Sequence, residues 1–195
     1  IQTADDLLLL SEMVSQGADY TGCYFKQTSD LDFAGKTWKP IGTYSYYHYS
    51  WKVKTSFTGV YDGAGHSIKN MTYDVTTDTA EGRGVGVFGT LGSQAVVKNL
   101  VIDSSCSFKG FMFVGAVAGD ASMYRNTTIS DCINYAAVHS ASAGGSNIIT
   151  EAYVGGIAGR VYGTITNCEN HGDVTTVAGA TSFANSGAYY VGGIV

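Results

Sequence analysis

A glycine motif is the first feature with the spacing that cofactor chemistry would need. Gly84-Val-Gly-Val-Phe-Gly89 matches the pattern of a dinucleotide-binding loop, which requires a following helix and an acidic residue about 20 positions further on. Residues 91–102 favour a strand instead, and the same glycines return at Gly115 and Gly119 without such a motif. The glycines therefore indicate a repeated backbone requirement, and we expect no cofactor.

Acidic and histidine residues offer only isolated candidates for metal or acid–base chemistry. Asp30 and Asp32 form a D-x-D pair, but the neighbouring sequence does not supply the further oxygen ligands that calcium takes. Turn or helix-cap contacts are therefore the expectation for this pair, and we expect no metal site. Asp62 and His66 are close together, but they fall in a turn-rich phrase, which favours a structural role. The sequence contains no HExxH or GxSxG phrase.

Few acidic residues are candidates for a catalytic acid or base. A polysaccharide-cleaving enzyme needs acid and base groups gathered on one face. The best set in this chain is Asp131, Glu169 and Asp173 with Lys98. We therefore predict that the chain is not an enzyme, and a polysaccharide lyase or glycosidase remains the alternative.

An aromatic segment is the strongest candidate for binding. Between Phe33 and Tyr61 the acidic chain contains no Asp or Glu but four lysines. Large rings with polar edges suit sugar rings or another protein's surface. The alternative is an edge hairpin whose rings cover the neighbouring coil. The candidate contact residues are Tyr44, Tyr46, Tyr47, Tyr49, Trp51 and Lys52.

A recurring phrase defines the scaffold that must position these residues. Its copies begin at Val85, Val114, Val154 and Val191. A second phrase follows each full copy, at Val97, Ile129 and Ile165. Repeats of about 30 to 40 residues indicate a solenoid. Each copy contains three β-rich pieces, too close together for crossover helices. The sequence therefore predicts an all-β fold, a right-handed parallel β-helix with three strands per coil and one interior ladder per phrase.

Two further sets of residues recur in the same register. Asn99, Asp131 and Asn167 are expected at one corner, because Asn and Asp tolerate the left-handed conformation there. Cys132 and Cys168 are expected to stack as small buried thiols, since the four cysteines do not form a disulfide framework or a zinc motif. Residues 140–147 and 181–188 are expected to be loops that lengthen two of the repeats.

The N-terminal segment predicts the single clear helix, over residues 3–16. Thr3 is the expected N-cap, Asp5 and Asp6 follow it in the first turn, and Gly17 is the expected stop. An apolar helix before the first coil suits a cap over the open end of a solenoid. We therefore predict a cap over residues 1–56 and repeats over residues 57–195.

Composition excludes several classes of partner. The net charge is −5 and the pI is about 5.2, so nucleic acids and anionic membranes would not be attracted electrostatically. No apolar run approaches the roughly 18 residues that span a bilayer, so direct membrane insertion is not expected. The chain begins at Ile1 and breaks its last phrase at Val195, which favours a piece of a longer protein.

The repeated phrases resemble the GLUG repeat. Val154-Gly-Gly-Ile-Ala-Gly159 carries the resemblance, and residues 57–71 are similar to the segment that precedes such repeats. Residues 29–33 and 38–42 are similar to the family's capping region. The resemblance implies an extracellular or surface-attached bacterial module of a larger protein, since such repeats accompany adhesins and some secreted peptidases without carrying catalytic residues themselves. The function it implies is adhesion or the binding of host or environmental glycans or protein surfaces. A pure structural spacer is the third possibility.

Overall fold

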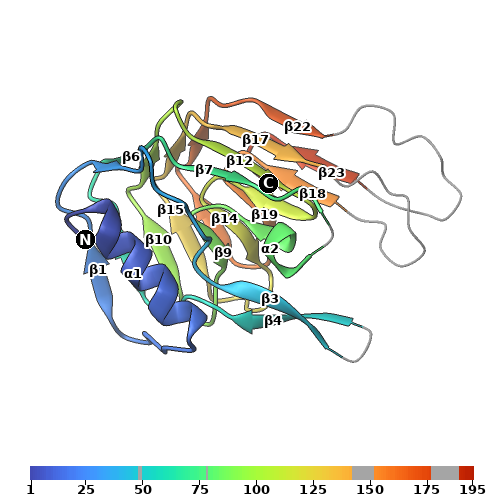
Figure 1. The fold of residues 1–195 in the computed structure, drawn as a ribbon, viewed down its shortest axis with the longest axis horizontal. Helices are drawn as coiled ribbons and strands as arrows, with labels where there is room; N and C mark the ends of the chain where they lie inside the picture. The colour runs from blue at the N-terminus through green and yellow to red at the C-terminus, as the bar shows by residue number, and fades with distance from the viewer. Residues whose placement is uncertain (48–49, 78, 142–151, 177–188) are drawn as a thin grey trace, which may run out of the picture.

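The chain forms a parallel β-solenoid in the computed structural model, which describes residues 1–47, 50–77, 79–141, 152–176 and 189–195 (Figure 1). A complete coil contributes one short strand to each of five parallel sheets. This corrects the expectation of three strands per coil, because two further short strands form between the three expected β-rich pieces. Gly156 and Ile157 separate β18, Ala152–Gly155, from β19, Ala158–Val161. Asn167 and Cys168 separate β20, Thr164–Thr166, from β21, Glu169–Asn170.

The five sheets are numbered here in the order in which a coil visits them. The first sheet stacks β1 Tyr24–Lys26, β5 Val60–Asp62, β10 Val96–Lys98, β15 Thr128–Ser130 and β20 Thr164–Thr166. The second stacks β2 Leu31–Asp32, β6 Ser67–Lys69, β11 Val101–Ile102, β16 Ile133–Asn134 and β21 Glu169–Asn170. The third stacks β7 Thr72–Asp74, β12 Ser107–Gly110, β17 Ala137–Ser140 and β22 Val174–Thr176. The fourth stacks β8 Gly84–Val85, β13 Phe113–Gly115, β18 Ala152–Gly155 and β23 Tyr189–Gly192, and the fifth stacks β9 Phe88–Thr90, β14 Ala118–Ala121 and β19 Ala158–Val161.

The predicted interior ladders are confirmed. The four phrase valines pair in register across the fourth sheet: Val85, Val114, Val154 and Val191. The residues of the second phrase do the same across the first sheet: Val97, Ile129 and Ile165. Buried members of both ladders belong to one hydrophobic core that runs the length of the stack. Gly86 illustrates the tightness of this packing, because a Cβ there would lie 2.3 Å from the carbonyl oxygen of Gly115 in the next coil.

The predicted corner is also confirmed. Asn99, Asp131 and Asn167 all have left-handed backbones, with φ of 52°, 56° and 53°. Asn70 is also left-handed, with φ of 56°, but it lies at a different corner, between β6 of the second sheet and β7 of the third. The thiols of the four cysteines are free. Of the two that were expected to be buried, Cys132 is buried, whereas Cys168, one coil further on, is half-buried. The expected loops at 140–147 and 181–188 lie almost entirely outside the described residues.

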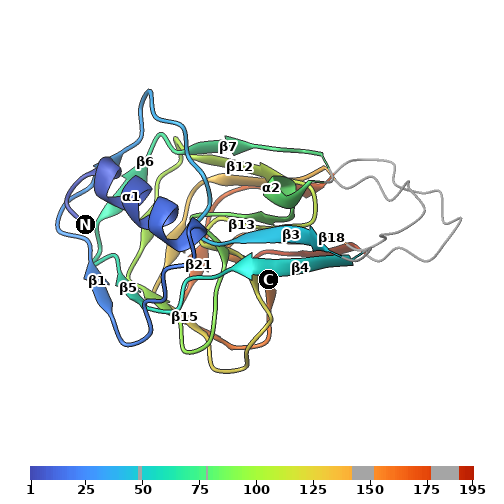
Figure 2. The same cartoon turned by 60° about the horizontal axis from the view of Figure 1, so that its bottom comes forward.

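Helix α1, Ala4–Ser15, covers the N-terminal end of the stack (Figures 1 and 2). Thr3 is its N-cap and forms a reciprocal capping box with Asp6, which satisfies two backbone donors that a helix start would leave unpaired. Leu7, Leu10 and Val14 bury against the core. Their spacing keeps them on one face of the helix, and Met13 lies outside that face, 40 % exposed.

The coil beneath α1 is incomplete. It supplies β1 and β2, but it has no strand for the third or fourth sheet. The chain runs instead from Phe33 to Ile41, which bridges to Phe88 of the fifth sheet. The interior of this gap is filled by side chains, among them Trp38, whose Nε1 donates to the carbonyl of Gly86 at 3.1 Å. The predicted cap, residues 1–56, thus contains strands of two sheets of the solenoid. One of them, β1, pairs with β5, which lies in the segment predicted as repeats.

A hairpin and a short helix interrupt the coils on one side of the stack (Figure 2). The hairpin consists of β3, Thr43–Tyr47, and β4, Ser50–Thr55, which pair antiparallel. Helix α2, Ala80–Arg83, follows β7 and contacts β3. These two insertions set the N-terminal coils apart from the regular repeats.

Candidate functional site

The aromatic segment folds as the hairpin β3–β4. Its register pairs Tyr46 with Trp51 and Ser45 with Lys52. The hairpin leaves the solenoid after Ile41 and returns at Phe57, both of which bridge to the next coil. Its two ends are therefore fixed by the stack. Of the candidate residues, Tyr49 lies outside the described residues, and so do the side chains of Tyr46, Tyr47, Trp51 and Lys52.

Tyr44 lies at the base of the hairpin and packs against the solenoid. Its side chain is only 5 % exposed, and its ring stacks on Phe113 with centroids 5.8 Å apart. Its hydroxyl donates to the carboxylate of Asp120 on β14. This placement removes Tyr44 from the expected contact surface and makes it one of the residues that attach the hairpin to the coils.

Asp120 is the centre of a buried polar cluster that the sequence did not predict. Its carboxylate is paired in a two-point contact with Arg160 of the next coil, at 2.8 Å to Nη2 and 3.3 Å to Nε. The backbone N–H of Ser122 donates to it at 2.8 Å. The Arg160 guanidinium lies 4.0 Å from the ring centroid of Phe113, a cation–π distance. One carboxylate thus connects the hairpin to two successive coils.

The ionisation of this cluster follows from its burial and its charges. Burial alone would raise the pKa of Asp120, but the hydrogen bond and positive charge of Arg160 outweigh burial and hold the pKa below its usual range. Burial, with the negative charge of Asp120 beside it, raises the pKa of the Tyr44 hydroxyl. Asp120 is therefore ionised and Tyr44 neutral at pH 7, so the pair consists of a hydroxyl donor and a carboxylate acceptor.

This cluster had only a weak signal in the sequence. Asp120 and Arg160 follow the last glycine of two successive phrases, at Gly119 and Gly159. Opposite charges at one repeat position indicate an ion pair between neighbouring coils, and the register confirms that they are paired. Nothing in the sequence links either residue to Tyr44.

Asp62 is the second well-connected carboxylate. It accepts hydrogen bonds from the hydroxyl of Tyr24 and, at 2.9 Å, from Nδ2 of Asn99, and its Oδ2 lies 3.6 Å from Nζ of Lys98. Burial would raise the pKa of Asp62, but these donors and the charge of Lys98 lower it to about 2. His66 does not join this group and lies 3.7 Å from Asp30 instead.

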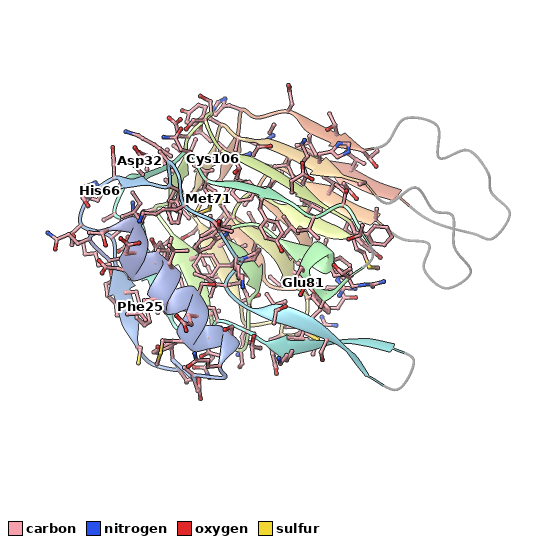
Figure 3. All side chains as sticks on the ribbon, in the orientation of Figure 1. Phe25, Asp32, His66, Met71, Glu81 and Cys106 are labelled. Carbon is pink, nitrogen blue, oxygen red and sulfur yellow. The ribbon has the colours of Figure 1, made fainter. Side chains whose placement is uncertain are left out.

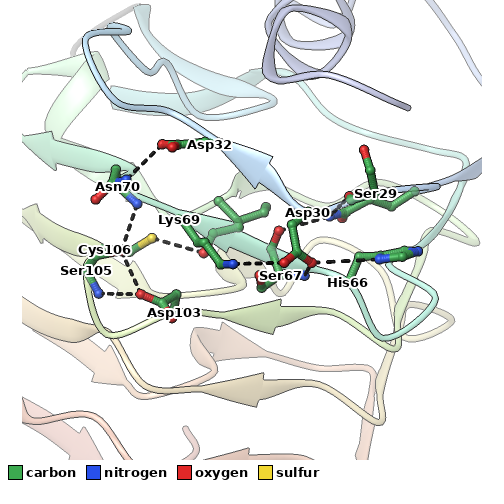
Figure 4. Close-up of polar contacts among 12 residues, drawn as sticks. Ser29, Asp30, Asp32, His66, Ser67, Lys69, Asn70, Asp103, Ser105 and Cys106 are labelled. Atoms are coloured by element: carbon green, nitrogen blue, oxygen red, sulfur yellow. Dashed lines mark hydrogen bonds and ion pairs between the residues drawn. The ribbon is translucent and has the colours of Figure 1, made fainter.

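The D-x-D pair makes turn and strand contacts (Figure 4). Asp30 accepts from Nζ of Lys69 at 2.8 Å and from the backbone of Ser67 at 2.9 Å, and these contacts lower its pKa to about 2. Asp32 accepts from the backbone of Ala34 and from Nδ2 of Asn70. Both carboxylates thus bind neighbouring elements of the fold.

The acidic set considered for an enzyme is dispersed among separate partners. Asp131 accepts from Asn167, Glu169 lies 2.9 Å from His171, and Lys98 belongs to the Asp62 group. In the part of the chain that the structure describes, no three His, Cys, Asp or Glu side chains gather as metal ligands would. The glycine motif at residues 84–89 contains β8 and the first two residues of β9, so it belongs to the coils of the solenoid.

Comparison with known proteins assigns the repeat. The model of the GLUG motif matches residues 150–175, which hold the last full phrase and its following strands. Since β13 and β8 pair in register with β18, the earlier phrases occupy the same structural position. The fold and the motif together describe a β-solenoid that contains a GLUG motif.

Two relatives extend this comparison. Halomucin of Haloquadratum walsbyi is 35 % identical over 80 residues, which is 40 % of this chain and 1 % of halomucin. A candidate immunoglobulin A1 protease of Bacteroides ovatus, known from a crystal structure, aligns with 90 % of this chain at a TM-score of 0.55 and 20 % identity, and the chain covers 57 % of it. The second likeness is one of fold. Within the described residues, neither helix is long and apolar enough to cross a membrane.

Proposed function

We propose that this chain is a non-catalytic module of an extracellular or surface-attached protein, and that it binds a glycan or protein surface through the tip of hairpin β3–β4. The GLUG motif and the likeness to halomucin support a surface module. The likeness to the Bacteroides protein is at 20 % identity, so no peptidase activity is carried over from it.

The observation that carries the binding proposal is the buried attachment of the hairpin. A hairpin that only shielded the first coil would need apolar contact alone. This one is also held by Tyr44, Asp120 and Arg160, a polar group connected to two coils. Ordering a binding surface before contact reduces the entropy lost on binding. We therefore propose Tyr46, Tyr47, Tyr49, Trp51 and Lys52 as the contact residues.

The test is binding to a glycan array and to a panel of extracellular matrix proteins. A Tyr47→Ala, Trp51→Ala double variant should bind at least about 30-fold more weakly, since central aromatic contacts contribute at least about 1 kcal/mol each. Its melting temperature should stay within a few degrees of the parent protein. The control is Tyr162→Ala, which removes a tyrosine that is 62 % exposed on the solenoid itself and should leave binding unchanged.

Four results would contradict the proposal. Equal binding by a stable double variant would move the site away from the hairpin. A large drop in melting temperature would make these rings part of the core. Release of oligosaccharides from polysaccharides by the purified chain would establish an enzyme, and failure of every probe to bind would leave a structural spacer.

A further inference from the structure

A groove lies where the first coil lacks its strands. Its volume of about 860 Å³ lies within the range of roughly 300 to 1,000 Å³ that is typical of ligand sites. Its walls come from the second half of α1, the segment leading to β3, the start of α2 and the third and fourth sheets. Figure 3 shows Glu81 at α2, beside β3. The groove is separate from the tip of the hairpin, although Thr43 and Lys54 at the hairpin base line it.

Strand β7 contributes Tyr73 to the lining of this groove, as does Val75 directly after the strand. Thr72 and Asp74 are the neighbours of Tyr73 in β7, which is the terminal strand of the third sheet. The N–H of Val75 donates to Lys109 and the carbonyl of Met71 accepts from Ser107, both at 3.0 Å. Because backbone groups alternate in direction along a strand, those of Thr72 and Asp74 point away from β12. Among the described residues, none pairs with these outward groups. The edge therefore offers two N–H groups and two carbonyls for a further strand.

The groove itself is amphipathic. The ring of Tyr73 is 9 % exposed at its floor, where Leu8 and Val75 are half-buried. Its rim carries the exposed side chains of Glu12, Lys39, Lys54 and Glu81. Among the described residues these four side chains form no ion pair. Apolar floor and unpaired charges of both signs suit a strand that alternates apolar and charged residues.

We propose that this groove binds an extended peptide, which adds a strand to β7 and takes the place of the strand that the first coil lacks. Backbone hydrogen bonds to Thr72 and Asp74 fix its register, as in other cases of strand addition. Its apolar residues face Tyr73 and its charged residues face the lysines and glutamates of the rim. A second solenoid could not occupy the same place, because α1 lies across this end of the stack.

The test uses short random peptides selected for binding to the intact chain, and the probe is the synthetic form of an enriched sequence. Asp74→Pro removes the outward N–H of residue 74. The hydrogen bonds between β7 and β12 are kept, because this N–H is not one of them and proline is tolerated at such edge positions. Peptide binding should weaken at least about tenfold. The matched control is Asp74→Asn, which removes the charge but keeps the N–H, and it should bind like the parent chain.

Two further measurements keep the result independent of folding defects. Ser15→Trp places a large ring in the groove from the exposed face of α1 and should also abolish binding. Peptide addition should slow hydrogen exchange at the amides of Thr72 and Asp74. The same peptide with methylated backbone nitrogens should bind weakly.

The proposal is overturned if no enriched peptide depends on the groove, if enriched peptides bind Asp74→Pro and Ser15→Trp as they bind the parent chain, or if the methylated peptide binds equally well. Displacement of the peptide by an oligosaccharide that also binds Asp74→Pro normally would assign the groove to glycans instead. Loss of binding in the Tyr47→Ala, Trp51→Ala variant would concern the hairpin alone, so the two proposals fail separately.

Discussion

At the scale of single residues, Asp120 has the most consequential position. The residue is 1 % exposed, and its carboxylate is paired with the guanidinium of Arg160 and the hydroxyl of Tyr44. A buried carboxylate of this kind is stable only because its partners compensate for the loss of water. Tyr44, which the sequence suggested as a ligand contact, is one of these partners.

Replacing Asp120 by Ala should destabilise the chain by about 3–5 kcal/mol, since it leaves the Arg160 charge without its partner in a largely buried site. Urea denaturation followed by circular dichroism measures this change. Tyr44→Phe is the milder comparison and should cost about 1–3 kcal/mol, because it removes one hydrogen bond and leaves the charge pair intact. If the free energy of unfolding of Asp120→Ala were within about 1 kcal/mol of that of the parent chain, the cluster would not have the stabilising role assigned to it.

At the scale of elements, the ladders determine how the coils stack. Val154 lies between Val114 and Val191 in the fourth sheet and is fully buried. Val191, in the last coil, is 49 % exposed. The same residue type at the same repeat position therefore has two environments, which provides an internal control.

Val154→Asp should prevent cooperative folding, because it buries a charge that has no partner. Val191→Asp should fold like the parent chain, since its side chain reaches water. Far-UV circular dichroism and urea unfolding distinguish the two variants. If Val154→Asp were soluble and cooperatively folded, the assignment of Val154 to the interior ladder would be wrong.

At the scale of the whole molecule, several carboxylates couple folding to pH. Asp30 and Asp62 have a pKa of about 2 in the folded chain, against 3.8 for the free side chain, and the pKa of Asp120 is also lowered. A lowered pKa in the folded state means that the unfolded state binds protons first as the pH falls. The stabilisation from these groups is therefore complete above about pH 4 and is lost as the pH falls towards 2.

Urea midpoints measured between pH 7 and pH 2 should stay level down to about pH 4 and then fall steeply. The comparison is Asp62→Asn, which cannot ionise at that position. Its midpoint should be lower at pH 7 and its decline in acid shallower. A parent chain whose midpoint does not change between pH 4 and pH 2 would rule out this coupling.

The sequence by itself determined the features that recur or act locally. The ladder at Val114 and Val154, the left-handed corner at Asn99 and the cap at Thr3 were all predicted, and the structure confirms them. The reason is physical: each coil repeats the constraints of the one before, and a helix cap depends on neighbours within one turn.

Only the tertiary structure decided the features that break the repeat. The contact of Tyr44 with Asp120 joins residues 76 positions apart, and it depends on where the hairpin returns to the stack. The groove beside β7 depends on strands that one coil omits, and the division of each coil into five strands depends on where its corners bend. A periodic pattern specifies what neighbouring coils share, whereas these features arise from the ways in which the coils differ.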